Sequence, residues 1–129
     1  MAELRSTRRK AADWALSGLV AFVMIGGAVA HFAATQAFAP LVPPFLPARP
    51  VILAAGLLQL GIGIAVLWPR TRALAALAFA ALCTAYLPLH LWDYVRPDPV
   101  FAPPVAATAR VVVQLLLISA GVTLWRRSR

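Results

Sequence analysis

The sequence predicts an all-α membrane protein, an antiparallel bundle of four transmembrane helices with both termini in the cytoplasm. Apolar residues make up 62% of the 129 residues and charged residues 12%, whereas a soluble domain carries about 25% charged residues. The apolar residues are gathered into four stretches, each about long enough to cross a hydrocarbon core of roughly 30 Å as a helix. The four stretches are Trp14–Ala34, Val51–Trp68, Ala73–Trp92 and Val105–Trp125.

The tryptophans support these spans, because all four lie at a boundary of one of the stretches. They are Trp14, Trp68, Trp92 and Trp125. An amphipathic ring prefers this position, where its flat body contacts lipid and its N–H group reaches the headgroups. The predicted spans therefore have aromatic anchors at the expected depth.

The basic residues predict the orientation of the chain. The net charge is +8, and nine of the twelve Lys and Arg residues flank the first span, the turn between the second and third spans, or the end of the fourth. If the chain crosses four times, these nine share one side, which the positive-inside rule makes cytoplasmic. We therefore predict a multi-pass protein of the cytoplasmic (inner) membrane. Its charge serves topology and contact with anionic lipid, not nucleic-acid binding.

The connections differ on the two sides. Nine of the eleven prolines lie in two outer loops, residues 35–50 and 93–104, which should be stiff and partly non-helical. The first loop is apolar, so we expect it at the mouth of the bundle or at the membrane interface, with room for a short helix. The inner connection, residues 69–72, is a tight turn that makes the second and third helices antiparallel neighbours. The whole chain, residues 1–129, is predicted to be one transmembrane domain.

Helix contacts in lipid should form at small residues, because close approach drives packing where the hydrophobic effect cannot. Gly56 and Gly63 lie seven residues apart on the second predicted helix, and Gly121 lies on the fourth. We expect these positions to face neighbouring helices.

The polar side chains of the spans gather in the outer half of the predicted bundle. With a rise of about 1.5 Å per residue, they fall at similar depths below the outer ends of their helices. Pro88 lies among them and removes one backbone hydrogen bond of the third helix. The candidate ligand-binding residues are His31, Gln59, Tyr86, His90, Arg110 and Gln114.

Arg110 allows two interpretations. Its long stem can reach outward to water or form an ion pair, with Asp93 and Asp98 as available partners. Alternatively, it contacts a ligand directly, and Gln114, one helical turn further on the same face, favours an inward-facing polar site. We predict no metal site, because two histidines and one carboxylate on separate elements form no tight ligand motif.

No catalytic set is apparent. Cys83 is the only cysteine, which excludes a thiol oxidoreductase that works through an internal dithiol. No nucleophile–base motif or phosphate-binding glycine loop is present. We therefore expect no self-sufficient enzyme, and any catalysis would be that of an oxidoreductase subunit.

The segment from about Gly27 to Arg127 resembles the DoxX family of small four-helix membrane proteins. The likeness rests on motifs in a particular order: His31-Phe32, the proline-rich stretch 41–47, Gly56 to Gln59, the basic turn 67–72, the Leu-Pro-Leu-His stretch 87–90, and Arg110 with Gln114. Relatives often carry glutamate where Gln59 aligns and asparagine where His90 aligns.

The resemblance implies a four-helix bundle and an association with redox chemistry. Some DoxX relatives are membrane subunits of thiosulfate:quinone oxidoreductase, and others are linked to oxidative-stress complexes. For this chain it implies a quinone as candidate cofactor and a redox protein as candidate partner. A small anion and a second copy of the chain are the other candidate partners.

Two functional hypotheses remain from the sequence. In the first, the chain is a membrane subunit of a redox system, and its outer-half pocket, lined by Gln59, Tyr86, Arg110 and Gln114, holds a quinone headgroup or small anion. In the second, it is a non-catalytic scaffold or assembly factor that binds a partner protein through its small-residue helix faces.

Overall fold

The computed structural model describes all 129 residues and is entirely helical. Four helices are long and apolar enough to cross a membrane, as the sequence predicts. Two short elements follow the first of them and form part of the connection to the second. The elements are α1 (Ala2–Ala33), α2 (Thr35–Phe38), the 3-10 helix η1 (Ala39–Leu41), α3 (Ala48–Ala65), α4 (Arg72–Trp92) and α5 (Val105–Ser128).

The helix boundaries differ most from the prediction in α1, which begins at Ala2 and not near Trp14. Its 32 residues span about 48 Å at about 1.5 Å per residue, more than a hydrocarbon core requires. The added turns are rich in Arg, Lys and Ala, which favour helix even where hydropathy shows no span. α3 begins three residues early, at Ala48, because Pro50 falls in its first turn, where a missing N–H costs nothing.

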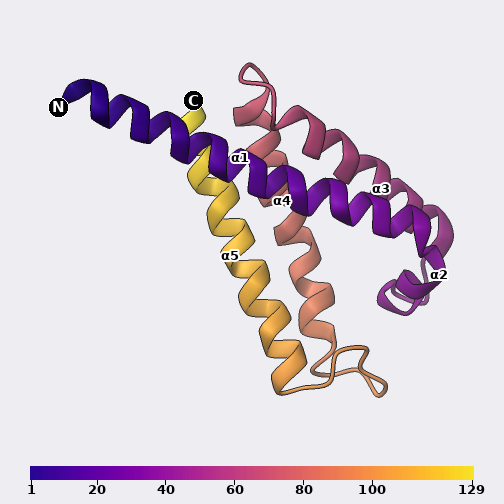
Figure 1. Cartoon of the computed structure of the whole chain (residues 1–129). Helices are drawn as coiled ribbons and strands as arrows, with labels where there is room; N and C mark the ends of the chain where they lie inside the picture. Colours follow the sequence, from indigo (N-terminus) through magenta and orange to yellow (C-terminus); the bar gives the residue numbers. More distant parts are fainter.

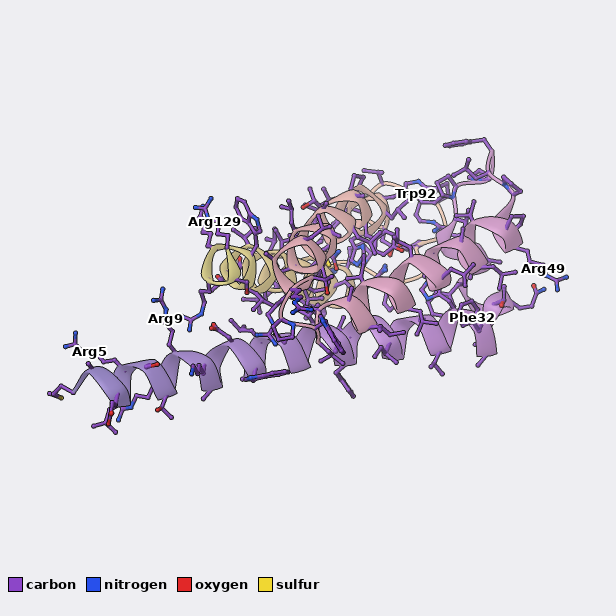
Figure 2. All side chains as sticks on the ribbon, turned by 90° about the horizontal axis from the view of Figure 1, so that it is seen from above. Arg5, Arg9, Phe32, Arg49, Trp92 and Arg129 are labelled. Carbon is purple, nitrogen blue, oxygen red and sulfur yellow. The ribbon has the colours of Figure 1, made fainter.

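The long helices form two pairs. α1 packs mainly against α3, and α4 packs mainly against α5. The two pairs cross each other and diverge away from the chain termini (Figure 1). We call the end with both termini the terminal end, and the end with residues 35–47 and 93–104 the loop end. Figure 2 shows Arg5, Arg9 and Arg129 toward the terminal end, and Phe32, Arg49 and Trp92 toward the loop end.

Glycines set the spacing within the α1–α3 pair. A Cβ atom on Gly27 would lie 2.3 Å from Oε1 of Gln59, and one on Gly56 would lie 3.0 Å from the ring of Phe32. A Cβ on Gly63 would lie 2.7 Å from Cγ1 of Ile25. Residue numbers thus rise along α1 as they fall along α3. Close approach at small residues holds this pair together, as expected in lipid.

The α4–α5 pair is built in the same way. Gly121 lies against Phe79, since an added Cβ would come within 2.8 Å of Cδ1 of that ring and within 3.0 Å of Cβ of Ala80. Nearer the middle of the pair, Nε2 of Gln114 donates to the carbonyl oxygen of Cys83 at 2.6 Å.

The apolar core lies where the two pairs cross, on the terminal side of the cavity described below. Its buried side chains come from all four long helices. Most other side chains of the long helices face outward, as in a protein whose surroundings are as apolar as its interior. The largest fully buried apolar residues are Val20 (α1), Val66 (the residue after α3), Phe79 (α4) and Leu124 (α5).

Asp93 organises the loop end. It caps α4, and its side chain is 1% exposed. Oδ2 accepts from Nη1 of Arg110 at 3.0 Å, and Oδ1 accepts from the backbone N–H of Val100 at 3.0 Å. Nη1 of Arg96 donates to the carbonyl oxygen of Pro40 at 2.8 Å, so the two loops are also joined to each other. One carboxylate thereby ties α4, α5 and the second loop together.

We predict that Gly121→Ala destabilises the fold by about 1–3 kcal/mol, because the added methyl group overpacks the contact with Phe79. Gly61→Ala is the matched control, since a Cβ atom there meets nothing within 4 Å. Thermal unfolding in detergent, followed by circular dichroism, measures both. Equal melting temperatures for the two variants would contradict the assigned α4–α5 contact.

We predict that Asp93→Asn lowers stability by about 3–5 kcal/mol, because it leaves the half-buried Arg110 without its counter-charge. In the double variant Asp93→Asn/Arg110→Met, the unpaired charge is removed, so the loss should be clearly smaller than the sum of the two single losses. Unfolding of the native chain, the two single variants and the double variant in one detergent gives the four free energies of this double-mutant cycle. If the losses of the two single variants add up to the loss of the double variant, Asp93 and Arg110 are not coupled.

Candidate functional site

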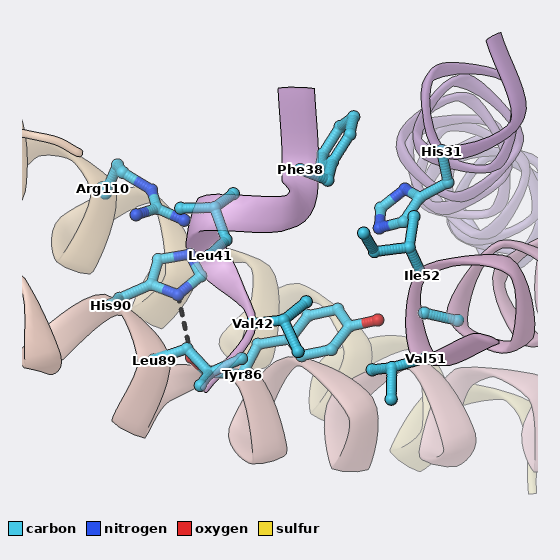
Figure 3. Close-up of a pocket in the computed structure, with 11 residues that line it drawn as sticks. His31, Phe38, Leu41, Val42, Val51, Ile52, Tyr86, Leu89, His90 and Arg110 are labelled. Carbon is cyan, nitrogen blue, oxygen red and sulfur yellow. Dashed lines mark hydrogen bonds between the residues drawn. The ribbon is translucent and has the colours of Figure 1, made fainter. Parts of the chain in front are cut away.

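A cavity of about 150 Å³ lies at the loop end, between the two helix pairs. It is partly open, and eight of its eleven lining residues are hydrophobic. Figure 3 shows that its polar side chains come from opposite sides, with His31 on one side and His90 and Arg110 on the other. The apolar wall is formed by Phe38, Leu41, Val42, Val51, Ile52, Ala55 and Leu89.

The two histidines are held in the same way. Nδ1 of His31 lies 2.6 Å from the carbonyl oxygen of Gly27, and Nδ1 of His90 lies 2.8 Å from that of Tyr86. Each ring thus bonds the carbonyl one helical turn before it, and His31 also stacks on Phe38, with ring centroids 4.2 Å apart. A carbonyl oxygen only accepts, so Nδ1 is the donor in both rings. Nε2 is therefore the ring atom free for a ligand.

Tyr86 and Gln59 form a second polar unit. Nε2 of Gln59 donates to the hydroxyl oxygen of Tyr86 at 3.2 Å. Gln59 is only 3% exposed, and its Oε1 has no hydrogen-bond partner. Tyr86 lines the cavity, with its hydroxyl group on the side of α1 and α3 (Figure 3). Because its oxygen already accepts from the amide, the hydroxyl hydrogen is available to another acceptor.

Arg110 forms the ion pair that the sequence allowed, and its contact with a ligand stays a prediction. It pairs with Asp93 and stacks over Phe101, with its guanidinium carbon 4.0 Å from the ring centroid. It also lines the cavity. Nη1 is its only group bonded to Asp93, so others of its five N–H donors remain for a ligand.

The structure brings together only some of the six candidate residues. His31, Tyr86, His90 and Arg110 line the cavity. Gln59 lies behind Tyr86 and touches the site only through that hydroxyl. Gln114 does not line it, because its amide donates to the carbonyl oxygen of Cys83. No group of three or more His, Cys, Asp or Glu side chains is placed to hold a metal ion.

Sequence reasoning did not identify the apolar wall of the cavity. Phe38 and Leu41 belong to the short helical elements after α1, and Val42 directly follows them; these residues line the cavity between the diverging pairs. The signal for them was the unusual apolarity of a proline-rich loop, which placed the segment near the bundle mouth without showing what it covers. In the sequence, nothing distinguishes Val51, Ile52 and Ala55 from ordinary lipid-facing residues of a span.

The cavity therefore offers polar groups at two ends and an apolar wall between them. One end has Nε2 of His31 and the hydroxyl group of Tyr86, and the other has Nε2 of His90 and the guanidinium group of Arg110. Each end combines one acceptor with one donor.

Comparison with known proteins gives one match. Residues 16–125 match the family described as "Domain of unknown function (DUF8561)". No curated protein and no solved structure matches the chain. The matched segment includes α3, α4, the larger part of α1 and α5, and every polar residue of the cavity, and the chain belongs to the DUF8561 family.

Proposed function

We propose that this protein is a membrane subunit of a redox system, resembling the DoxX family, and that the loop-end cavity holds a quinone headgroup. The observation that carries the proposal is the placement of polar groups at two opposite ends of a cavity whose wall is otherwise apolar. A quinone headgroup has the same distribution, with two oxygen atoms on opposite sides of an apolar ring.

The size of the cavity supports a ring. Its volume is about 150 Å³, which is about that of an engineered protein cavity that accepts benzene. Because the cavity is partly open, substituents of a larger headgroup and an attached chain can extend out of it.

The charge balance supports a neutral ring over a small anion, the other ligand that the sequence suggested. Arg110 is the only cation in the cavity lining with a fixed charge, and the carboxylate of Asp93 lies 3.0 Å from its Nη1. An anion would have to compete with that carboxylate, whereas a neutral oxygen atom needs only a free N–H donor.

We further propose that the chain crosses the cytoplasmic membrane four times as an antiparallel bundle, with both termini in the cytoplasm. Contacts at the terminal end support this topology. Nε of Arg127 lies 2.6 Å from Oδ1 of Asp13, and the guanidinium group of Arg72 stacks over Trp14 at 4.3 Å. The start of α4 and the end of α5 therefore lie beside α1 near its basic segment, where positive charge favours the cytoplasm.

A reporter assay tests the topology. Alkaline phosphatase, which is active only outside the cytoplasm, should be inactive when fused after Arg129 and active when fused after Pro99 in a truncated chain. Green fluorescent protein should give the opposite pattern, since it fluoresces when folded inside. Opposite behaviour of the two reporters would reverse the orientation and place the cavity near the cytoplasmic face.

Purification tests the ligand. Protein extracted from its own membranes should contain quinone detectable by mass spectrometry. Ala55→Phe should lower this content by about tenfold, equivalent to about 1.4 kcal/mol, because Ala55 lines the cavity and the larger ring fills it. Ala54→Phe is the matched control, because Ala54 is exposed on the outer face of α3. Quinone content that does not change in Ala55→Phe would argue against this cavity.

The scaffold hypothesis keeps one specific observation in its favour. A Cβ atom on Gly18, Gly26 or Gly61 would meet nothing within 4 Å, so small residues face outward on α1 and α3, where a partner helix could approach closely. The same preparation discriminates the two functions. A partner recovered in stoichiometric amount without any quinone would favour a scaffold.

A further inference from the structure

We propose that the cavity prefers the reduced, dihydroxy form of the ring, a hydroquinone, over the quinone. This inference rests on the proposed function, because it assigns the form of ligand that the same cavity selects. It follows from the hydrogen-bond donors and acceptors at the two ends.

The histidines supply the acceptors. Their Nδ1 atoms donate to the carbonyl oxygens of Gly27 and Tyr86, at 2.6 and 2.8 Å. An imidazole in its neutral form carries a single N–H, and in that form Nε2 of each ring has a lone pair and no hydrogen. Figure 3 shows the two rings on opposite sides of the cavity, His31 from α1 and His90 from α4.

Tyr86 supplies a donor at the His31 end. Its hydroxyl oxygen accepts from Nε2 of Gln59 at 3.2 Å, and the hydroxyl hydrogen is therefore directed away from the amide. Gln59 also lies against Gly27, whose carbonyl oxygen holds His31. The donor and the acceptor at this end are thus positioned by the same small region of α1 and α3.

Arg110 supplies a donor at the His90 end. Asp93, Arg110 and Phe101 hold the guanidinium group in place through the ion pair at 3.0 Å and the stacking at 4.0 Å. Its N–H groups beyond the one bonded to Asp93 can only donate. The cavity contains no carboxylate among its lining residues.

Each end thus pairs one acceptor with one donor, and this pair matches a hydroxyl group. A phenolic hydroxyl donates to the imidazole and accepts from the tyrosine or the guanidinium. A quinone carbonyl only accepts, so both imidazole Nε2 atoms would lose water and gain no partner. Because the two Nε2 atoms have no partner in the quinone complex, the cavity should bind the dihydroxy form about tenfold or more tightly than the quinone.

The test uses the full chain in lipid nanodiscs and three probes that share one ring. They are tetramethylhydroquinone under anaerobic conditions, its dimethyl ether, and tetramethylbenzoquinone. The hydroquinone should bind about tenfold more tightly than either of the others in calorimetric titration. The dimethyl ether keeps both oxygen atoms but cannot donate, so its weak binding would assign the preference to the two hydroxyl hydrogens. Equal binding of all three probes would overturn this inference and leave the proposed function standing.

Two variants test whether the histidines are the hydrogen-bond acceptors for the hydroquinone. His31→Phe and His90→Phe each remove one Nε2 and keep a ring of similar size. Each should weaken hydroquinone binding by about tenfold while tetramethylbenzoquinone binding stays the same or improves. Ala54→Phe, on the outer face, should bind all probes as the native chain does. A hydroquinone preference that persists in both histidine variants would overturn the assignment.

If a variant fails to fold, the three probes on the native chain still decide the preference. If none of the probes binds the native chain, both the inference and the proposed function fail.

Discussion

A polar group inside a bilayer has no water to bind, so the chain itself must provide its partner. This constraint determines the loop end of the molecule. His31 and His90 each use the carbonyl oxygen one turn earlier, and Gln114 uses that of Cys83. Asp93 accepts from Arg110 and from a backbone N–H. These bonds hold the side chains in place, and they decide which atoms of each side chain remain available to a ligand.

The same membrane setting explains where the cavity forms. At the terminal end, Gly63 and Gly121 allow helices within each pair to approach closely, and the pairs meet in an apolar core. Toward the loop end the pairs diverge (Figure 1). The gap is partly covered by α2 and η1, whose apolar side chains form part of the wall, while the polar side chains come from the long helices. A site built in this way has polar groups held by hydrogen bonds and a cover made of a separate segment.

Much of the fold could be predicted from sequence, because apolar runs of sufficient length have few alternatives in lipid. The clustering of polar residues at one depth, and Asp93 as a partner for Arg110, followed from helical rise and loop position. The extension of α1 to Ala2 could not be predicted in this way, because hydropathy detects only the part of a helix that lies in hydrocarbon. The different environments of Arg110 and Gln114, one turn apart on α5, could not be predicted either. A bond from Gln114 to a carbonyl of α4 depends on the rotation of the two helices about their axes, which periodicity along one helix does not specify.

The orientation of a single amide links these features. If the amide of Gln59 were reversed, Oε1 would accept from the hydroxyl group of Tyr86, and two N–H donors would face Gly27 without partners. In the observed orientation one N–H group donates to Tyr86, and the carbonyl oxygen lacks a partner. A buried acceptor without a partner is tolerated better than a buried donor, so the observed orientation is the more stable one. It also leaves the hydroxyl hydrogen of Tyr86 free. Gly27 permits this arrangement, because a Cβ atom there would lie 2.3 Å from Oε1, and its carbonyl oxygen holds His31 at the same time. One glycine in α1 therefore supports both the donor and the acceptor at that end of the cavity.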